Sequence, residues 1–104
     1  RVAIQQLIDI QKQVQLGDYS VLPKVPAIIK STALQSFPRQ DVADLFGTEW
    51  EAFLDQSYNG PSFTQQFPGQ LYALSYHSPN NSGLNEQFWQ QCQLWISTHR
   101  SAYD

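Results

Sequence analysis

The stretch from about Leu84 to Arg100 constrains the fold most, because its mostly apolar side chains recur at the period of an α-helix. The spacings are four, four, three, one and three residues, in the order Leu84, Phe88, Cys92, Trp95, Ile96 and His99. Residues at these intervals share one face of a helix, so this stripe is expected to pack against the rest of the protein. No segment alternates over several β-branched residues, and strands are therefore not expected.

Two further helices are expected in the first third of the chain. One covers about Val2–Leu16, stops at Gly17, and has apolar side chains near a helical period at Ile4, Leu7, Ile8 and Val14. A connector, Asp18–Pro26, follows, in which Ser20 is a candidate cap. The second helix then runs to about Ser36, because Pro38 cannot continue it. Its expected buried stripe is Val25, Ile29, Thr32 and Ala33.

The middle of the chain contains the clearest local signal. A short segment starting at Asp41 puts Val42, Leu45 and Phe46 on one face, and Gly47 is expected to close it in a left-handed conformation. Thr48-Glu49-Trp50-Glu51 then matches a capping box, in which Thr48 and Glu51 satisfy two unpaired backbone amides. The helix that it starts should turn Trp50, Phe53 and Leu54 inward and end by Ser57.

The second half begins with turns and ends with the long helix already described. Residues 58–69 are predicted to form an ordered loop that Phe63 and Phe67 hold to the core. A short helix over about Gln70–Tyr76 and an exposed loop over residues 78–83 should follow. The prediction for residues 1–104 is thus an all-α fold, a compact single-domain bundle of about five to six helices.

Composition and charge exclude several classes of function. The chain has 104 residues, a formal net charge of −3 and only six Lys and Arg, which are scattered, so a nucleic acid partner is not expected. Cys92 is the only cysteine, which excludes an intrachain disulfide and favours a reducing, cytoplasmic compartment. No apolar run approaches the roughly 18 residues of a membrane span. Since the chain starts at Arg1, we expect it to be a fragment of a longer parent.

The chain has few side chains that could act as nucleophiles, general bases or metal ligands. We therefore predict neither an enzyme, nor a cofactor, nor a metal site. No H-E-x-x-H, paired Cys motif or phosphate-binding Gly loop occurs. Cys92 and His99 would lie two helical turns apart, so Cys92 is interpreted as a buried structural thiol. Two alternatives stay open. The chain could be an enzyme whose catalytic site, near Arg39, Asp41 and His77, matches none of these motifs. It could also be a sensor with a ligand cavity of about 300 Å3 or more between its helices.

Two residues are candidates for contact with a partner protein. Trp89 lies about 100° from the direction of Phe88 on the last helix, so its ring is expected to be exposed, within an apolar patch rimmed by some of the fifteen Gln. Arg39 is expected either to pair with Asp55 or Glu51 as a structural clamp, or to face a partner.

Three groups of residues form a pattern that is typical of one family. They are Phe37-Pro38-Arg39, Val42-Ala43, Leu45, Gly47, Trp50 and Phe53-Leu54-Asp55 in the centre, Ile28–Leu34 before it, and Trp95-Ile96 with His99-Arg100 near the end. With these residues the chain resembles a bacterial family, domain of unknown function 4381 (DUF4381), over about Val21 to Arg100. The central motif also has a structural interpretation, in which Pro38 stops a helix, Gly47 turns the chain, and Trp50, Phe53 and Leu54 close the core.

The resemblance implies a small bacterial inner-membrane protein. Its parts would be a short N-terminal region, one transmembrane helix, a basic stretch and this cytoplasmic domain, encoded beside MoxR-type AAA+ ATPases and von Willebrand factor A domain proteins. The implied role is that of a non-catalytic adaptor for one of these partners. No catalytic residues are established for the family, so none is assigned here. Neither the anchor nor the basic stretch is present in these residues, and membrane attachment would come only through that anchor.

Overall fold

The computed structural model of the protein describes residues 2–75 and 85–102. Over these ranges it contains seven α-helices, one 3-10 helix and no strand. In chain order they are α1 (Val2–Gln15), η1 (Tyr19–Val21), α2 (Lys24–Ser36), α3 (Arg39–Val42), α4 (Gly47–Gln56), α5 (Phe63–Gln66), α6 (Gln70–Leu74) and α7 (Glu86–Thr98). The all-α prediction is confirmed, but these ranges contain seven α-helices, four of them of seven residues or more, rather than the five to six expected. The predictions for Tyr76, His77, Leu84 and the loop 78–83 lie outside the described residues.

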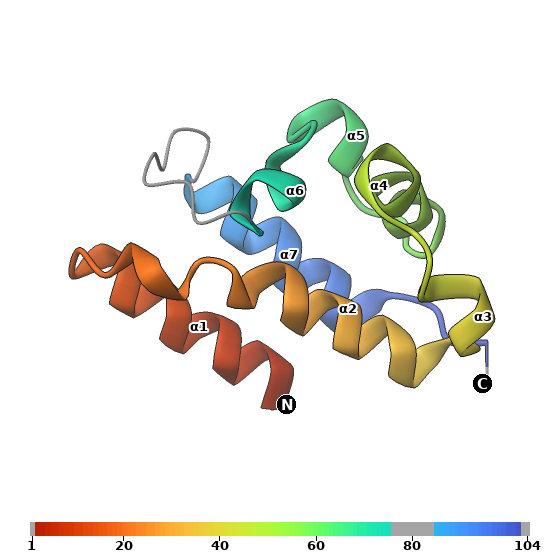
Figure 1. The fold of residues 1–104 in the computed structure, drawn as a ribbon, viewed down its shortest axis with the longest axis horizontal. Helices are drawn as coiled ribbons and strands as arrows, with labels where there is room; N and C mark the ends of the chain where they lie inside the picture. The colour runs from red at the N-terminus through yellow and green to blue at the C-terminus, as the bar shows by residue number, and fades with distance from the viewer. Residues whose placement is uncertain (1, 76–84, 103–104) are drawn as a thin grey trace.

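The helices form two layers (Figure 1). The three long helices α1, α2 and α7 pack on one another and make the lower layer, with α1 and α2 antiparallel in front and α7 behind them. The shorter helices α4, α5 and α6 lie above, where α6 contacts α2 and α4 contacts both α5 and α6. This arrangement leaves α7 covered from more than one side.

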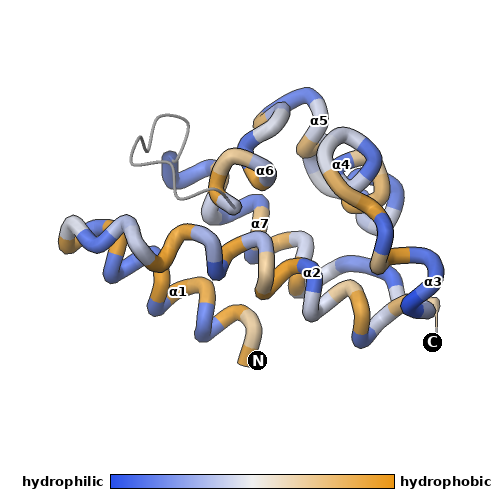
Figure 2. Tube along the Cα trace, viewed as in Figure 1, coloured by the Kyte–Doolittle hydropathy of each residue, from blue (hydrophilic) through white to orange (hydrophobic). Residues whose placement is uncertain are grey.

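The core is built from the faces that the helical period predicts. On α2 the fully buried residues are Val25, Ile29 and Ala33, as expected from their spacing, whereas Thr32 of the predicted stripe is only half-buried. On α1 the buried residues are Leu7, Ile10 and Val14, whereas Ile4 and Ile8 of the predicted set are only half-buried. Figure 2 shows apolar positions recurring along both helices. On α7 the predicted stripe is confirmed at Phe88, Cys92, Trp95 and Ile96, each 0 % exposed. Burial of these side chains is the main stabilising contribution, at about 1.5–3 kcal/mol for each large one.

The start of α4 differs from the prediction. The helix begins at Gly47, whose φ of 58° is left-handed as expected, but its N-cap residue is Phe46 and no side chain caps it. Thr48 lies inside the first turn with an exposed side chain. Glu51 turns inward, where its carboxylate accepts a 2.8 Å hydrogen bond from the backbone of Gly69. The predicted capping box is therefore wrong, because Glu51 satisfies an amide of another segment.

The segment expected to be a loop contains the additional helix α5. Asp55, at the end of α4, accepts hydrogen bonds from the backbone N–H groups of Phe63 and Thr64 and from the hydroxyl of Ser62. The Ser62 hydroxyl in turn accepts from the Gln65 backbone as the N-cap. These two residues satisfy the amides of the first turn, so a single helical turn forms between the predicted turns. Phe63 is buried and Phe67 packs against the core, as predicted.

The chain beyond α7 joins the ends of α2 and α4. The backbone N–H of Arg100 donates to Ser57 O at 2.7 Å, and that of Ala102 donates to Ser36 O at 2.8 Å. His99, the C-cap of α7, stacks on Trp95 with ring centroids 4.2 Å apart, and its Nε2 lies 2.7 Å from Ser36 Oγ. The position predicted for His99 at the helix end is confirmed, and the helix ends at Thr98 because these contacts turn the chain away.

Candidate functional site

Trp89 does not provide an exposed contact. Its side chain is 4 % exposed, and its ring meets that of Phe88 edge-on at 5.9 Å. The prediction that Trp89 centres an exposed patch is therefore wrong. The reason is that most of the surface of α7 is covered by other segments. Helices α1 and α2 cover one side of it, and the segment carrying Pro61 and Phe67 covers another.

Arg39 is exposed on α3 and does not form the predicted clamp. Both candidate carboxylates are engaged elsewhere: Asp55 caps α5, and Glu51 accepts from Gly69. A role for Arg39 in contacting a partner stays a prediction. Asp41 is also exposed on α3, whereas His77 lies outside the described residues, so the alternative catalytic site near these three residues stays untested.

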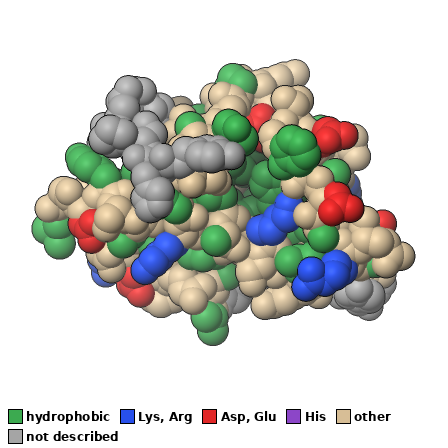
Figure 3. Space-filling model, viewed as in Figure 1, with side chains coloured by type: hydrophobic (Ala, Val, Ile, Leu, Met, Phe, Trp, Pro, Cys, Tyr) green, Lys and Arg blue, Asp and Glu red, His purple; other side chains and the backbone are tan. Residues whose placement is uncertain are grey.

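A hollow of about 300 Å3 opens between α2, α6 and the start of α4, and we call it the aromatic groove. Figure 3 shows hydrophobic side chains gathered around a hollow in the middle of this face, with a basic side chain at its edge. The residues of the groove that matter here are Pro26, Lys30, Phe46, Trp50, Leu71 and Tyr72.

The local structure explains why two aromatic rings of the groove face solvent. Phe46 has extended backbone angles as the N-cap of α4, which directs its side chain outward and leaves it 71 % exposed. Phe46 was expected to share a face with Val42 and Leu45, but Val42 is buried whereas Phe46 is not. On α6, Leu71 and Leu74 point into the core, so Tyr72 between them is 52 % exposed. Trp50, only 6 % exposed, forms the floor between the two rings.

Lys30 is the charged group within this groove. Its Nζ donates a 2.6 Å hydrogen bond to Leu45 O and lies 4.3 Å from the centroid of the Trp50 ring. Burial lowers the pKa of Lys30 below its usual value, an effect that the charge of Asp44 opposes. Through Leu45, Lys30 also holds the segment that presents Phe46. Lys30 could not be identified from the sequence, because a single Lys on a helix carries no local signal of burial.

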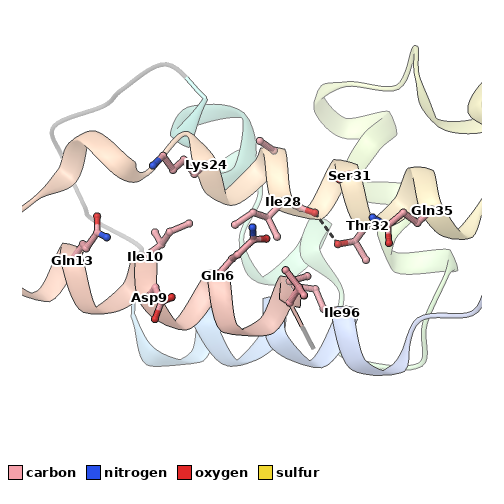
Figure 4. A pocket seen from close by; sticks show the side chains of 13 residues that line it. Gln6, Asp9, Ile10, Gln13, Lys24, Ile28, Ser31, Thr32, Gln35 and Ile96 are labelled. Carbon is pink, nitrogen blue, oxygen red and sulfur yellow. Dashed lines mark hydrogen bonds between the residues drawn. The ribbon is translucent and has the colours of Figure 1, made fainter.

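A second and larger depression, of about 790 Å3, runs between α1 and α2. In Figure 4, Gln6 and Gln13 of α1 point toward α2, which carries Lys24, Thr32 and Gln35 along its side of the groove. Ile10, Ile28 and Ile96 supply its apolar lining. The volume of this α1–α2 groove exceeds the roughly 300 Å3 expected of a ligand cavity. The side-chain amides of its Gln residues can both donate and accept hydrogen bonds.

The other reactive groups are buried or isolated. Cys92 is 0 % exposed, and burial raises the pKa of its thiol, which keeps it protonated and inert. Burial also raises the pKa of Tyr58 to about 12. Across residues 2–75 and 85–102, His, Cys, Asp and Glu do not gather in any group of three or more that could hold a metal. In the same part of the chain, no helix has the length and apolar character needed to cross a bilayer.

Comparison with known proteins identifies a family. The sequence profile of a family described as "Domain of unknown function (DUF4381)" matches residues 1–98. Neither a curated protein nor a solved structure matches the chain.

Proposed function

The chain belongs to the DUF4381 family, and we propose that it is a non-catalytic protein-interaction domain, an adaptor that binds its partner through the aromatic groove. The observation that supports this proposal is the pair Phe46 and Tyr72, which stand 71 % and 52 % exposed at one hollow floored by Trp50. Isolated exposed rings are common, but aromatic side chains around a common hollow are typical of surfaces that bind another protein.

The energetics of the groove agree with this proposal. Phe46 contributes little burial to the folded domain, so its outward position has no evident role in stability. Covering an apolar side chain of this size by a partner would contribute about 1.5–3 kcal/mol. Trp50 and Leu71 make a firm floor because both are held in the core, which reduces the entropy lost on binding.

The proposed partners are a MoxR-type AAA+ ATPase and a von Willebrand factor A domain protein. The support for them is the resemblance of the central and C-terminal motifs to this family. The same resemblance supports a place at the cytoplasmic face of the bacterial inner membrane, through an anchor in the parent protein. The single buried cysteine is compatible with a reducing compartment.

The test is a binding measurement between the full-length parent and each purified partner. We expect Phe46→Ser and Tyr72→Ser to weaken binding by at least about tenfold, the equivalent of 1.4 kcal/mol. Leu16→Ser is the matched control, because Leu16 is 87 % exposed and lies outside the groove. Phe46→Ser should leave the thermal unfolding midpoint almost unchanged, because Phe46 is 71 % exposed. Undiminished binding by a Phe46→Ser, Tyr72→Ser double variant would exclude this surface.

A second candidate function is the binding of a small polar ligand in the α1–α2 groove, which its volume of about 790 Å3 favours. Thermal unfolding in the presence of a panel of amino acids and nucleosides tests it. A ligand that raises the midpoint should lose its effect in Ser31→Trp, since Ser31 is an exposed residue of that groove and the larger side chain would fill it. A panel without any effect would count against this candidate.

A further inference from the structure

The charge of the aromatic groove narrows the chemistry of its occupant. An ammonium group has three N–H donors, and Lys30 Nζ has one hydrogen bond, to Leu45 O. No carboxylate of the described residues forms an ion pair with it. The neighbouring walls are apolar, formed by Pro26, Trp50 and Leu71. A cation in such surroundings interacts more strongly with an anion than one that is fully hydrated.

The start of α4 adds to this positive character. Gly47, its first residue, lines the groove, and no side chain caps the helix. The partial positive charge of a helix N-terminus extends over the first turn, so it acts on an anion in the same direction as Lys30. Glu49, in that first turn, is exposed and is not part of the groove lining.

The size of the groove limits how much of a partner can enter it. About 300 Å3 is at the low end of the range for ligand pockets, about 300–1,000 Å3, and suits one or two side chains rather than a helix. A single ammonium pairs with a carboxylate as well as with a phosphate, and of these two anions the carboxylate is the one that the Asp and Glu of a partner protein carry without modification.

We infer that the aromatic groove recognises an acidic segment of the partner protein, with an apolar side chain inserted between Phe46 and Tyr72 and an adjacent Asp or Glu paired with Lys30 Nζ. This inference rests on the proposed adaptor function and specifies what the adaptor binds. The apolar side chain would lie on Trp50. The carboxylate would take a free donor of Lys30 while the bond to Leu45 O stays in place.

Two matched probes test the inference directly. They are the N-acetylated, C-amidated dipeptides phenylalanyl-glutamate and phenylalanyl-glutamine, which differ only in one carboxylate. Each is titrated into the isotope-labelled chain of residues 1–104, and binding is followed by NMR at the Trp50 indole and the Gly47 amide. We expect the glutamate peptide to bind at least about fivefold more tightly, because its hydrogen bond to Lys30 is charged on both sides. This preference should decline as salt is added.

Variants of Lys30 separate recognition from folding. In Lys30→Gln the preference for the glutamate peptide should disappear, whereas Lys30→Arg should retain it. Lys24→Gln is the matched control, since Lys24 lies on the same helix but does not line this groove. Circular dichroism would show whether each variant folds. Equal binding of the two peptides by the unmodified chain, or shifts confined to residues outside the groove, would overturn the inference.

The two proposals fail in different ways. If the partner depends on Phe46 and Tyr72 but the two dipeptides bind equally, the preference for an acid is wrong and the adaptor function stands. If the glutamate peptide is preferred but no partner depends on these rings, the acid-binding groove stands and the proposed adaptor function is wrong.

Discussion

The indole Nε1 of Trp95 donates a 2.9 Å hydrogen bond to the hydroxyl of Ser57, and this bond joins α7 to the end of α4 within the core. Trp95 is 0 % and Ser57 5 % exposed, so water cannot replace either partner. The Ser57 hydroxyl also donates to Leu54 O, and the backbone carbonyl of Ser57 accepts from the backbone N–H of Arg100. Ser57 thus joins the end of α4 to α7 through its side chain and to the segment after α7 through its backbone carbonyl.

Replacing Ser57 by Ala should destabilise the fold. The substitution leaves the Trp95 indole N–H buried without an acceptor, which costs about 1–3 kcal/mol. Urea unfolding followed by tryptophan fluorescence measures the loss. Ser97→Ala is the matched control, because Ser97 also bonds a helix carbonyl but is exposed. Equal effects of the two substitutions would show that the Trp95 bond contributes nothing specific.

Glu51→Gln should change how stability depends on pH. Burial raises the pKa of Glu51 above its usual 4.5, and the charge of Asp55 raises it further against the Gly69 hydrogen bond. The unfolded chain therefore ionises Glu51 first. Its contribution to the free energy of unfolding is largest below pH 4.5 and falls as pH rises through the folded-state pKa.

A Gln at this position can still accept the hydrogen bond from Gly69 but cannot ionise. The stability of the variant relative to the unmodified protein should therefore increase as pH rises from about 4 to about 7. Urea unfolding at several pH values measures this difference. If the two stability profiles run parallel across that interval, burial does not perturb Glu51 in the manner described.

A third prediction concerns two candidate helix caps, Asn85 and Thr48, whose substitution by Ala should affect stability differently. Asn85 caps α7, with its side-chain oxygen accepting a 2.9 Å bond from the Phe88 backbone. Asn85→Ala should cost about 0.5–2 kcal/mol. Thr48→Ala should change the free energy of unfolding by less than about 0.5 kcal/mol, because Thr48 caps nothing. A larger loss at Thr48 than at Asn85 would restore the capping box inferred from the sequence.

The thiol of Cys92 should report opening of the core. It is 0 % exposed and its pKa is raised, so a thiol reagent reacts only when the chain opens. With a stability of about 5 kcal/mol or more, labelling of the native chain should be at least about a thousandfold slower than in urea. Gln40→Cys in a Cys92→Ala background supplies an exposed reference. Comparable native labelling rates at the two positions would contradict the burial.

The long helices could be predicted because each carries the evidence for its own buried face. Val25, Ile29 and Ala33 follow one another at the period of α2, and any partner that covers this face buries all three. The α7 stripe is predictable for the same reason. Such periodic patterns predict which helices form, and they identify the principal core residues without knowledge of any tertiary contact.

The candidate site could not be predicted, because its properties come from contacts between distant segments. Trp89 is buried by residues outside its own helix, and Lys30 is desolvated by Trp50 and Leu45, which follow it by fifteen residues or more. Glu51 satisfies the pattern of a capping box, yet the amide of Gly69 competes for its carboxylate. Local sequence specifies what a side chain is able to do, whereas the fold selects which partner it meets.

The bonds from Arg100 and Ala102 back to Ser57 and Ser36 set an order of events during synthesis. The α1–α2 pair leaves the ribosome first, but the helix that covers its apolar faces is completed roughly sixty residues later, about 3–12 s at bacterial rates of translation. During that interval the nascent chain presents unprotected hydrophobic surface. The core can close only after the last helix has emerged, so we expect the complete fold to form after these residues have been translated.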